Sequence, residues 1–420
     1  MALVSSSSKF VIPDAYLACS HGHVPPLQLE SSSISGQVAD WTRIEQNVKV
    51  VKYNPSQNKL TLSNGKEFTY KALVLAPGFH HNPEGIEGLP ELRKLPEADK
   101  VFVHMLDNKD TNDKNYYHGW DHVNGDMLCY SPKGPYKGEG TDFWACYYES
   151  FMRQDKLQGR TAQGARIQYW TPNKEIFRFS YANEIALEEC HKRGIDVMLG
   201  WELKKVWVNS YGEKMAQFVN VDNGQTLEKP FNHMNINPPS QAHKELVEAG
   251  ITDESGLIDV NPFTLQHSRF ENIFAWGDAI KGETTRTQHA AIAQCPVVKH
   301  NLTQFMDGKE LNGIYAGYSF MPFYLSHSHA TGFSHTWNYE PTATNHWCPQ
   351  YGVFAQAYFT YQMKGSLKFT KSYSGLDKNH GPPHKHWNKI YDPLDKNEYL
   401  ASKGIDVEAL RNVHKKGVVA

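Results

Sequence analysis

A short strand that is apolar on both faces and ends on glycine constrains the fold of this chain more than any other feature. The run ALVLA at residues 72–76 is followed by Pro77 and Gly78, and an Asn64-Gly65 hairpin turn precedes it. Continuous apolar strands belong in parallel sheets that are covered on both sides, and their carboxyl ends face a ligand crevice. The sequence therefore predicts an α/β fold whose ligand crevice lies near Gly78.

A second α/β unit follows the first along the chain. Its signals are a strand at 166–170, a helix at 181–193 that ends on glycine, and further strands within 195–224. The chain then returns with ENIFAWGDA, residues 271–279, and with a helix that starts near Thr287. A chain that crosses to a second unit and comes back predicts two Rossmann-like domains.

Composition excludes several classes of protein. The 420 residues carry 43 basic and 45 acidic side chains, a net charge of -2, without a long block of one sign, which argues against a nucleic-acid binder. Mean hydropathy is -0.58, and no run reaches the length of a membrane-spanning helix. The six cysteines are far apart and form no CxxC, so neither a disulfide framework nor a structural zinc site is expected.

The order of motifs from about residue 1 to about residue 375 resembles one family, the sulfide:quinone oxidoreductases. These are membrane-surface flavoproteins of the FAD-dependent pyridine nucleotide-disulfide reductase superfamily. The resemblance rests on SSSKFVIP, LTLSNGKEFTYKALVLAPG, HMNINPPSQ, GLIDVNPFTLQHSRFENIFAWGDA, TTRTQHAAIAQ and YAGYSFMPF. Each motif alone is weak, and the ordered set is specific.

The resemblance implies a division of the chain into five segments. The first FAD-binding-like domain is expected to be truncated at its N-terminus and to be completed after the second Rossmann-like domain. An aromatic-rich C-terminal region, facing a membrane or a partner, and a C-terminal extension come last. In that order, the segments are 1–125 (FAD-binding-like), 126–260 (second Rossmann-like), 261–310 (return to the FAD-like domain), 311–375 (C-terminal region) and 376–420 (extension).

The glycine-rich turn on which the family's FAD diphosphate rests is absent from the sequence. The chain begins at what resembles the second strand, and Ser5 stands where the family usually has an acidic residue for the adenosine ribose. Without the turn, the diphosphate loses backbone donors and the positive end of a helix dipole. The resemblance therefore implies that FAD binding is lost. An incomplete chain start would also explain the missing turn.

The two redox cysteines that the family uses beside the flavin are also replaced. Met321 stands at one position and Gly138 at the other, and a thioether cannot form a thiolate or a disulfide. Under a shifted register, Cys129 and Cys146 are the fallback thiols. The expected set of catalytic residues is therefore empty unless one of those two cysteines is used.

The predicted flavin contacts are vestigial. Gly78 and Asp278 remain at cofactor-binding positions, but Arg286, Gln288 and His289 stand where the family tends to have lysine and small residues. Such bulky side chains are expected to fill space that the ring would occupy. We expect Asp278 to satisfy amides at the start of a helix rather than a flavin hydroxyl.

Three further candidate sites have a simpler structural interpretation. Cys295 precedes Pro296 in an apolar helical stretch, which predicts a core residue. The segment WTPNKEIFR has no glycine triad, so a nicotinamide site is not expected there. No metal site is expected either, because no carboxylate or cysteine completes the histidine sets, whose members are His327, His329, His335, His384 and His386.

Two functions follow from these observations. The favoured one is a catalytically inactive accessory subunit of a mitochondrial inner-membrane respiratory complex, without a cofactor, peripheral to the membrane and bound to other subunits. Aromatic residues in 354–365 would contact the membrane or, preferably, a protein partner. The alternative is an active FAD-dependent oxidoreductase that uses Cys129 or Cys146.

Overall fold

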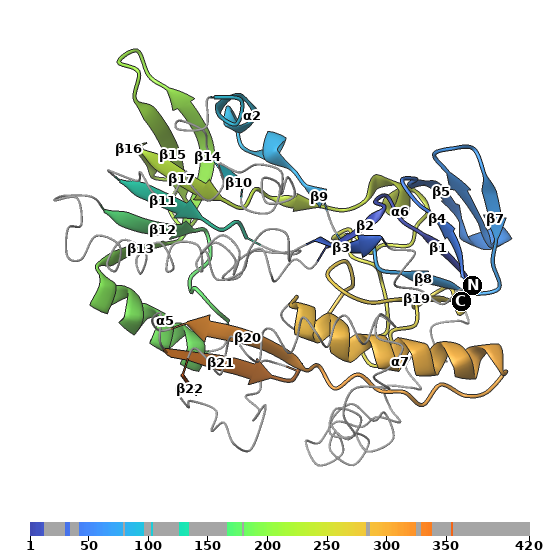
Figure 1. The fold of residues 1–420 in the computed structure, drawn as a ribbon. Coiled ribbons are helices and arrows are strands. Elements are labelled where there is room, and N and C mark those ends of the chain that lie inside the picture. The colour runs from blue at the N-terminus through green and yellow to red at the C-terminus, as the bar shows by residue number, and fades with distance from the viewer. Residues whose placement is uncertain are drawn as a thin grey trace.

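The computed structural model has the two-domain α/β arrangement that the sequence predicts (Figure 1). It describes segments of both domains. They are residues 1–11, 30–33, 42–78, 80–95, 102–103, 126–133, 166–178, 180–282, 286–324, 329–337 and 354–355.

The first domain is built from short paired strands. Parallel pairs join β1 (Ala2–Val4) to β4 (Arg43–Glu45) and β8 (Leu73–Leu75) to β19 (Ile273–Ala275). An antiparallel pair joins β2 (Lys9–Val11) to β3 (Glu30–Ser33). Although β8 and β19 lie about 200 residues apart in sequence, they are direct neighbours in a parallel pair.

An antiparallel meander lies between β4 and β8 in sequence. It contains β5 (Val50–Asn54), the 3-10 turn Pro55–Gln57, β6 (Lys59–Leu62) and β7 (Glu67–Thr69), with strand order β5-β6-β7. The predicted hairpin is confirmed, since Gly65 joins β6 to β7 with a φ of 80°. Positive φ is the conformation for which glycine is preferred in tight hairpins.

The second domain centres on a five-stranded parallel sheet. Its strand order is β10-β17-β11-β12-β13. The helix α5 (Ser180–Arg193) contacts β13, close to the predicted 181–193. The strands are β10 (Phe102–Val103), β17 (His233–Ile236), β11 (Met127–Tyr130), β12 (Ile167–Thr171) and β13 (Ile195–Leu199).

A three-stranded antiparallel sheet covers one face of the parallel sheet. It consists of β14 (Trp201–Val208), β15 (Lys214–Asn220) and β16 (Thr226–Phe231). The shared core includes Trp170 and Phe218, whose rings stack at 4.0 Å between centroids. Aromatic rings in such contact bury a large apolar area and hold the two sheets together.

Two short connections link the domains. The chain leaves through β9 (His80–His81) and returns through β18 (Ser240–Gln241), and these two strands pair antiparallel. Two small helices and a 3-10 turn flank the connections, namely Pro83–Gly85 (3-10), α2 (Leu89–Leu92) and α6 (Lys244–Glu248).

The helix α7 (Gln288–Met306) lies along the first domain and leads to the last strands (Figure 1). Thr287 is its N-cap, as the sequence placed it, and Pro296 lies inside the helix. The strands β20 (Ser319–Tyr324), β21 (His329–His335) and β22 (Phe354–Ala355) then form an antiparallel sheet. Contacts between α7 and β20 join this sheet to the first domain.

Candidate functional site

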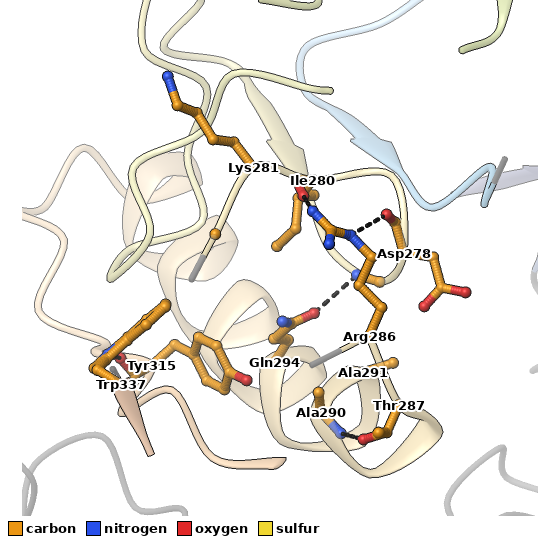
Figure 2. Close-up of a pocket in the computed structure, with 12 residues that line it drawn as sticks. Asp278, Ile280, Lys281, Arg286, Thr287, Ala290, Ala291, Gln294, Tyr315 and Trp337 are labelled. Carbon is orange, nitrogen blue, oxygen red and sulfur yellow. Dashed lines mark hydrogen bonds between the residues drawn. The ribbon is translucent and has the colours of Figure 1, made fainter. Parts of the chain in front are cut away.

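The candidate site lies where β19 ends and α7 begins (Figure 2). After Ala275 the backbone turns at Gly277, whose φ is 86°, a value that glycine adopts without strain. The Gly277 N–H donates to Oε1 of Gln294 on α7 over 2.8 Å. A backbone donor at the end of the strand is therefore already bound by a side chain of the same domain.

Arg286 folds back onto this turn. Its Nε donates to the carbonyl of Asp278 over 3.0 Å, and its Nη2 donates to the carbonyl of Ile280 over 3.3 Å. Figure 2 shows the guanidinium lying against the turn, between Asp278 and Ile280. Two hydrogen bonds from a charged donor hold the arginine in this position.

The start of α7 is capped by the side chain of Thr287. Thr287 Oγ1 accepts a hydrogen bond from the Ala290 N–H over 3.1 Å and lies 2.8 Å from Oγ of Ser319. A threonine cap satisfies one of the free amides at a helix start, which is the end of the helix that favours anions.

Little space is left between these groups. The cavity among them has a volume of about 10 Å³, which is enough for roughly one water molecule. Tyr315 and Trp337 line the side of the cavity that lies away from Arg286, beyond Gln294 (Figure 2). Pockets that hold a cofactor-sized ligand are typically at least about 300 Å³ in volume.

Gly78, the other predicted contact, lies in the turn after β8 with a φ of 68°. The His243 imidazole is near this turn, and its ring centroid lies 4.1 Å from that of His80. Burial and the neighbouring His80 lower the pKa of His243, while Glu245 and the carbonyls of Pro77 and Gly78 act in the opposite direction. Gly78 follows β8 and Asp278 follows β19, and these two strands are paired, so the two predicted contacts lie after neighbouring strand ends.

Ser5, the other residue near the predicted nucleotide, lies directly after β1. Its N–H donates to the Glu45 carbonyl over 2.9 Å, and its Oγ accepts from the Ser7 N–H over 3.2 Å. The backbone of Ser5 thus extends the pairing of β1 with β4.

The cysteines that the structure describes are buried or half-buried. Cys129 is fully buried in β11. Burial raises the pKa of Cys190 to about 12 and also raises the pKa of Cys295, which is half-buried in α7 rather than in the core as predicted. Raised pKa values disfavour the reactive thiolate. Cys146 and Gly138 lie outside the described residues, and Met321 lies in β20 with its side chain outside the description.

The histidine sets can be followed only in part. His335 is buried in β21, where its Nδ1 lies 2.9 Å from the Thr336 carbonyl, and burial lowers its pKa. No group of three metal-ligating side chains occurs among the described residues. His329 lies in β21, but its side chain falls outside the description, as do those of Gln288 and His289. His327, His384, His386, residues 356–365 and the rest of residues 376–420 fall outside it entirely.

Sequence reasoning missed two buried asparagines in the second domain. Asn235 and Asn237 belong to HMNIN, which was interpreted only as a family motif. Both are buried at the carboxyl end of β17, with exposed fractions of 2% and 0%. The signal was the alternation Met-Asn-Ile-Asn, which places two amides on one face of an interior strand.

Comparison with known proteins supports the resemblance. No family model matches the chain. Mitochondrial sulfide:quinone oxidoreductase of Schizosaccharomyces pombe is 27% identical over 274 residues, 64% of this chain and 57% of that protein. The Mus musculus protein of the same name is 26% identical over 276 residues, 65% and 59% of the two chains. The chain thus spans less than three fifths of these relatives.

Solved structures match over a greater length. A chain in the mitochondrial ATP synthase of Tetrahymena thermophila superposes with a TM-score of 0.76 at 23% identity, covering 91% of each chain. The sulfide:quinone oxidoreductase of Aquifex aeolicus superposes with a TM-score of 0.70 at 16% identity, covering 93% of this chain and 89% of that one. The resemblance and the fold class expected from the sequence are confirmed.

Within the described part of the chain, no helix combines the length and apolarity that are needed to cross a bilayer.

Proposed function

We propose that this relative of the sulfide:quinone oxidoreductases is a non-catalytic accessory subunit of a mitochondrial inner-membrane complex. The observation that carries the proposal is the turn after β19, whose backbone groups are bound by side chains of the same domain. There Arg286 and Gln294 bind the Asp278 and Ile280 carbonyls and the Gly277 amide, and the remaining cavity holds about one water molecule. The residues present do not fit a flavin at this position.

The sequence supports the same conclusion at two other points. Met321 and Gly138 replace the expected cysteines. Cys129, the fallback thiol that the structure describes, is fully buried in an interior strand. A buried thiol in a sheet is typical of inert packing rather than of a redox site.

A structural match supports an assembly. A chain in the Tetrahymena thermophila ATP synthase superposes with a TM-score of 0.76 over 91% of its length, compared with 0.70 over 89% for the Aquifex aeolicus sulfide:quinone oxidoreductase. We therefore propose that the complex is a mitochondrial ATP synthase and that this chain lies at its membrane periphery. Residues 354–365 are the proposed contact with a neighbouring subunit or the membrane surface.

The test is an absorption spectrum of the natively purified chain together with mass spectrometry of the proteins that co-purify with it. We expect no flavin bands and ATP synthase subunits in the same preparation. Flavin bands in stoichiometric amount would contradict the proposal and favour the alternative, an FAD-dependent oxidoreductase that uses Cys129 or Cys146. Isolation as a free monomer from gently solubilised mitochondria would contradict the accessory role.

A further inference from the structure

The outer face of the sheet formed by β14, β15 and β16 carries an apolar strip. Figure 1 shows this sheet on the side of the second domain that lies away from α7. Trp207, Met215 and Pro230 are register partners across the three strands. A neighbouring residue in each strand belongs to the buried core, so these three side chains point away from it. Register partners lie about 5 Å apart, and the strip is therefore continuous.

Tyr211 lies in the turn between β14 and β15, which begins one register pair beyond the strip. Its side chain is 87% exposed, the highest value among the large hydrophobic side chains that the structure describes. Tryptophan, tyrosine and methionine are enriched in protein interfaces, and contiguous apolar surface of this kind marks a contact site. We call Trp207, Tyr211, Met215 and Pro230 the β14–β16 patch.

Five hydrogen bonds fix the turn that carries Tyr211. Asn209 Oδ1 accepts from the N–H groups of Tyr211 and Glu213 over 2.9 Å each, and Asn209 Nδ2 donates to Oε2 of Glu213 over 2.8 Å. The N–H groups of Asn209 and Gly212 donate to the carbonyls of Glu213 and Asn209 over 2.9 and 3.0 Å. Because the turn is already ordered, it loses little conformational entropy when a partner binds.

Two exposed carboxylates lie beside the β14–β16 patch. Glu228 is two residues before Pro230 in β16 and therefore lies on the same face. Its Oε1 accepts a hydrogen bond from the side-chain amide of Gln217 over 3.3 Å. Glu213, at the base of the turn, is bound by the side-chain amide of Asn209. Neither amide carries a charge that would compensate its carboxylate.

The lysines near the patch have their own partners. Lys205, on the same face, forms an ion pair with Glu87 over 2.7 Å, and its Nζ lies 5.8 Å from the centre of the Trp207 ring. Lys214 belongs to the opposite face, where its Nζ lies 5.9 Å from the centre of the Phe231 ring. The described rim of the patch is therefore acidic, which is complementary to a partner that carries lysine or arginine.

Three other occupants are disfavoured. An anionic membrane surface attracts clusters of lysine and arginine, whereas this rim is acidic. A second copy of the chain would place the same carboxylates against each other. An added strand would meet the edge strand β16 at Pro230, which has no N–H to donate. The observations favour a different protein that receives the side chains of the patch.

We propose that the β14–β16 patch binds another protein subunit through an apolar pocket that has lysine or arginine at its rim. The ordered turn presents Tyr211 to the pocket, and Glu213 and Glu228 face the basic rim. This contact rests on the proposed role as an accessory subunit, and it adds to the contact proposed at residues 354–365.

The first experiment places a photoreactive p-benzoylphenylalanine at position 211 of the full-length chain in its own cells. After irradiation, mass spectrometry of the purified assembly identifies the cross-linked protein and peptide. We expect one subunit that differs from this chain, with apolar residues and lysine or arginine around the cross-linked position. The same probe at Val51, which is 45% exposed in β5 of the first domain, should not reach that peptide.

The second experiment measures competition with the tagged wild-type chain in the same cells. Tyr211→Ser removes the ring, and Glu228→Lys reverses the charge at the rim. For each variant, the ratio to wild type in the assembly should fall at least about ten-fold below the ratio in total protein. Val51→Ser and Glu254→Lys are the matched controls at exposed positions of remote elements, and their ratios should be unchanged. Equal melting temperatures of the purified chains show that the variants are folded.

Three outcomes would overturn the proposal. A probe at position 211 that labels only lipid, a second copy or nothing, in a chain that still co-purifies with its assembly, would remove this contact and leave the proposed function standing. Undiminished incorporation of both Tyr211→Ser and Glu228→Lys would have the same meaning. A chain that is always a free monomer would contradict the proposed function as well.

Discussion

The polar groups at the carboxyl ends of the parallel strands are hydrogen-bonded differently in the two domains. At the end of β19, the backbone groups are bound by side chains from the same domain, with Arg286 on two carbonyls and Gln294 on one amide. At the end of β17, two buried asparagines present amide atoms that the described chain does not pair. The comparison indicates that the backbone groups after β19 are paired within their own domain, whereas the Asn235 and Asn237 amides have no partner among the described residues.

The difference has an energetic reason. A turn at the end of a strand exposes backbone groups, and these must be paired by a ligand, by water or by the protein. In the first domain the long side chains of residues 286 and 294 take over this role. The second domain keeps polar groups in its interior although apolar residues would pack there at lower cost.

The largest effect is expected from removing a paired buried amide, and the contrast with an unpaired one tests the comparison directly. Asn301→Leu leaves two carbonyls and one N–H of Thr264 and Gly313 without partners. It should lower the free energy of unfolding by about 3 kcal/mol or more. Asn235→Leu, which removes an unpaired amide, should change that free energy by less than about 1 kcal/mol. Urea unfolding measures both, and equal losses would mean that Asn235 is paired.

The next largest effect on stability is expected at the turn after β19, where Gln294 binds the Gly277 N–H. Gln294→Leu removes the acceptor of the Gly277 N–H and should lower the free energy of unfolding by about 2 kcal/mol. Gln304→Leu on the same helix is the control, because its side chain makes only a 3.5 Å contact with His300 and the change should stay within about 0.5 kcal/mol. A similar loss in both variants would show that the turn does not depend on the bond.

Arg286→Ala should have a smaller effect on stability and none on cofactor binding. The variant loses two hydrogen bonds to carbonyls at a partly exposed position, which should lower the free energy of unfolding by about 1 kcal/mol. FAD added to this variant should leave its melting temperature unchanged, because Gln294 still binds the Gly277 N–H and Thr287 still caps α7. FAD binding that appears only in the variant would show that the arginine alone excludes the flavin.

The sequence was sufficient to predict the elements that depend on local signals. The Asn64-Gly65 hairpin, the strand that ends before Gly78 and the Thr287 cap of α7 all have short-range causes, namely positive φ, apolar runs and a side-chain acceptor for helix amides. These were predicted close to their observed positions. The predicted bulk at Arg286 was also consistent with the small cavity that the structure has there.

The hydrogen bonds of the two sites could not be predicted in the same way. Arg286 has several rotatable bonds, and its direction depends on carbonyls that the fold brings near it. The alternation in HMNIN indicates which face carries the amides of Asn235 and Asn237, but not whether a distant segment pairs them. Pairing is a property of tertiary structure, and therefore the contrast between the domains became visible only in three dimensions.

The smallest expected effect is a pH dependence that arises at two buried histidines. In the folded chain the pKa values of His243 and His335 are lowered from the ordinary value of 6.5, chiefly by burial. The unfolded chain therefore takes up protons first as the pH falls through about 6.5, so this contribution to stability is complete above that pH and is lost below it. The double variant His243→Gln, His335→Gln should lose less stability than the wild type between about pH 7.5 and about pH 5.5.

Urea midpoints at the two pH values measure this difference. Because the comparison uses the change with pH rather than the absolute stability, any packing defect of the variant cancels. Equal losses in both proteins would mean that the two imidazoles are not the source, and that other groups set the acid sensitivity of the fold.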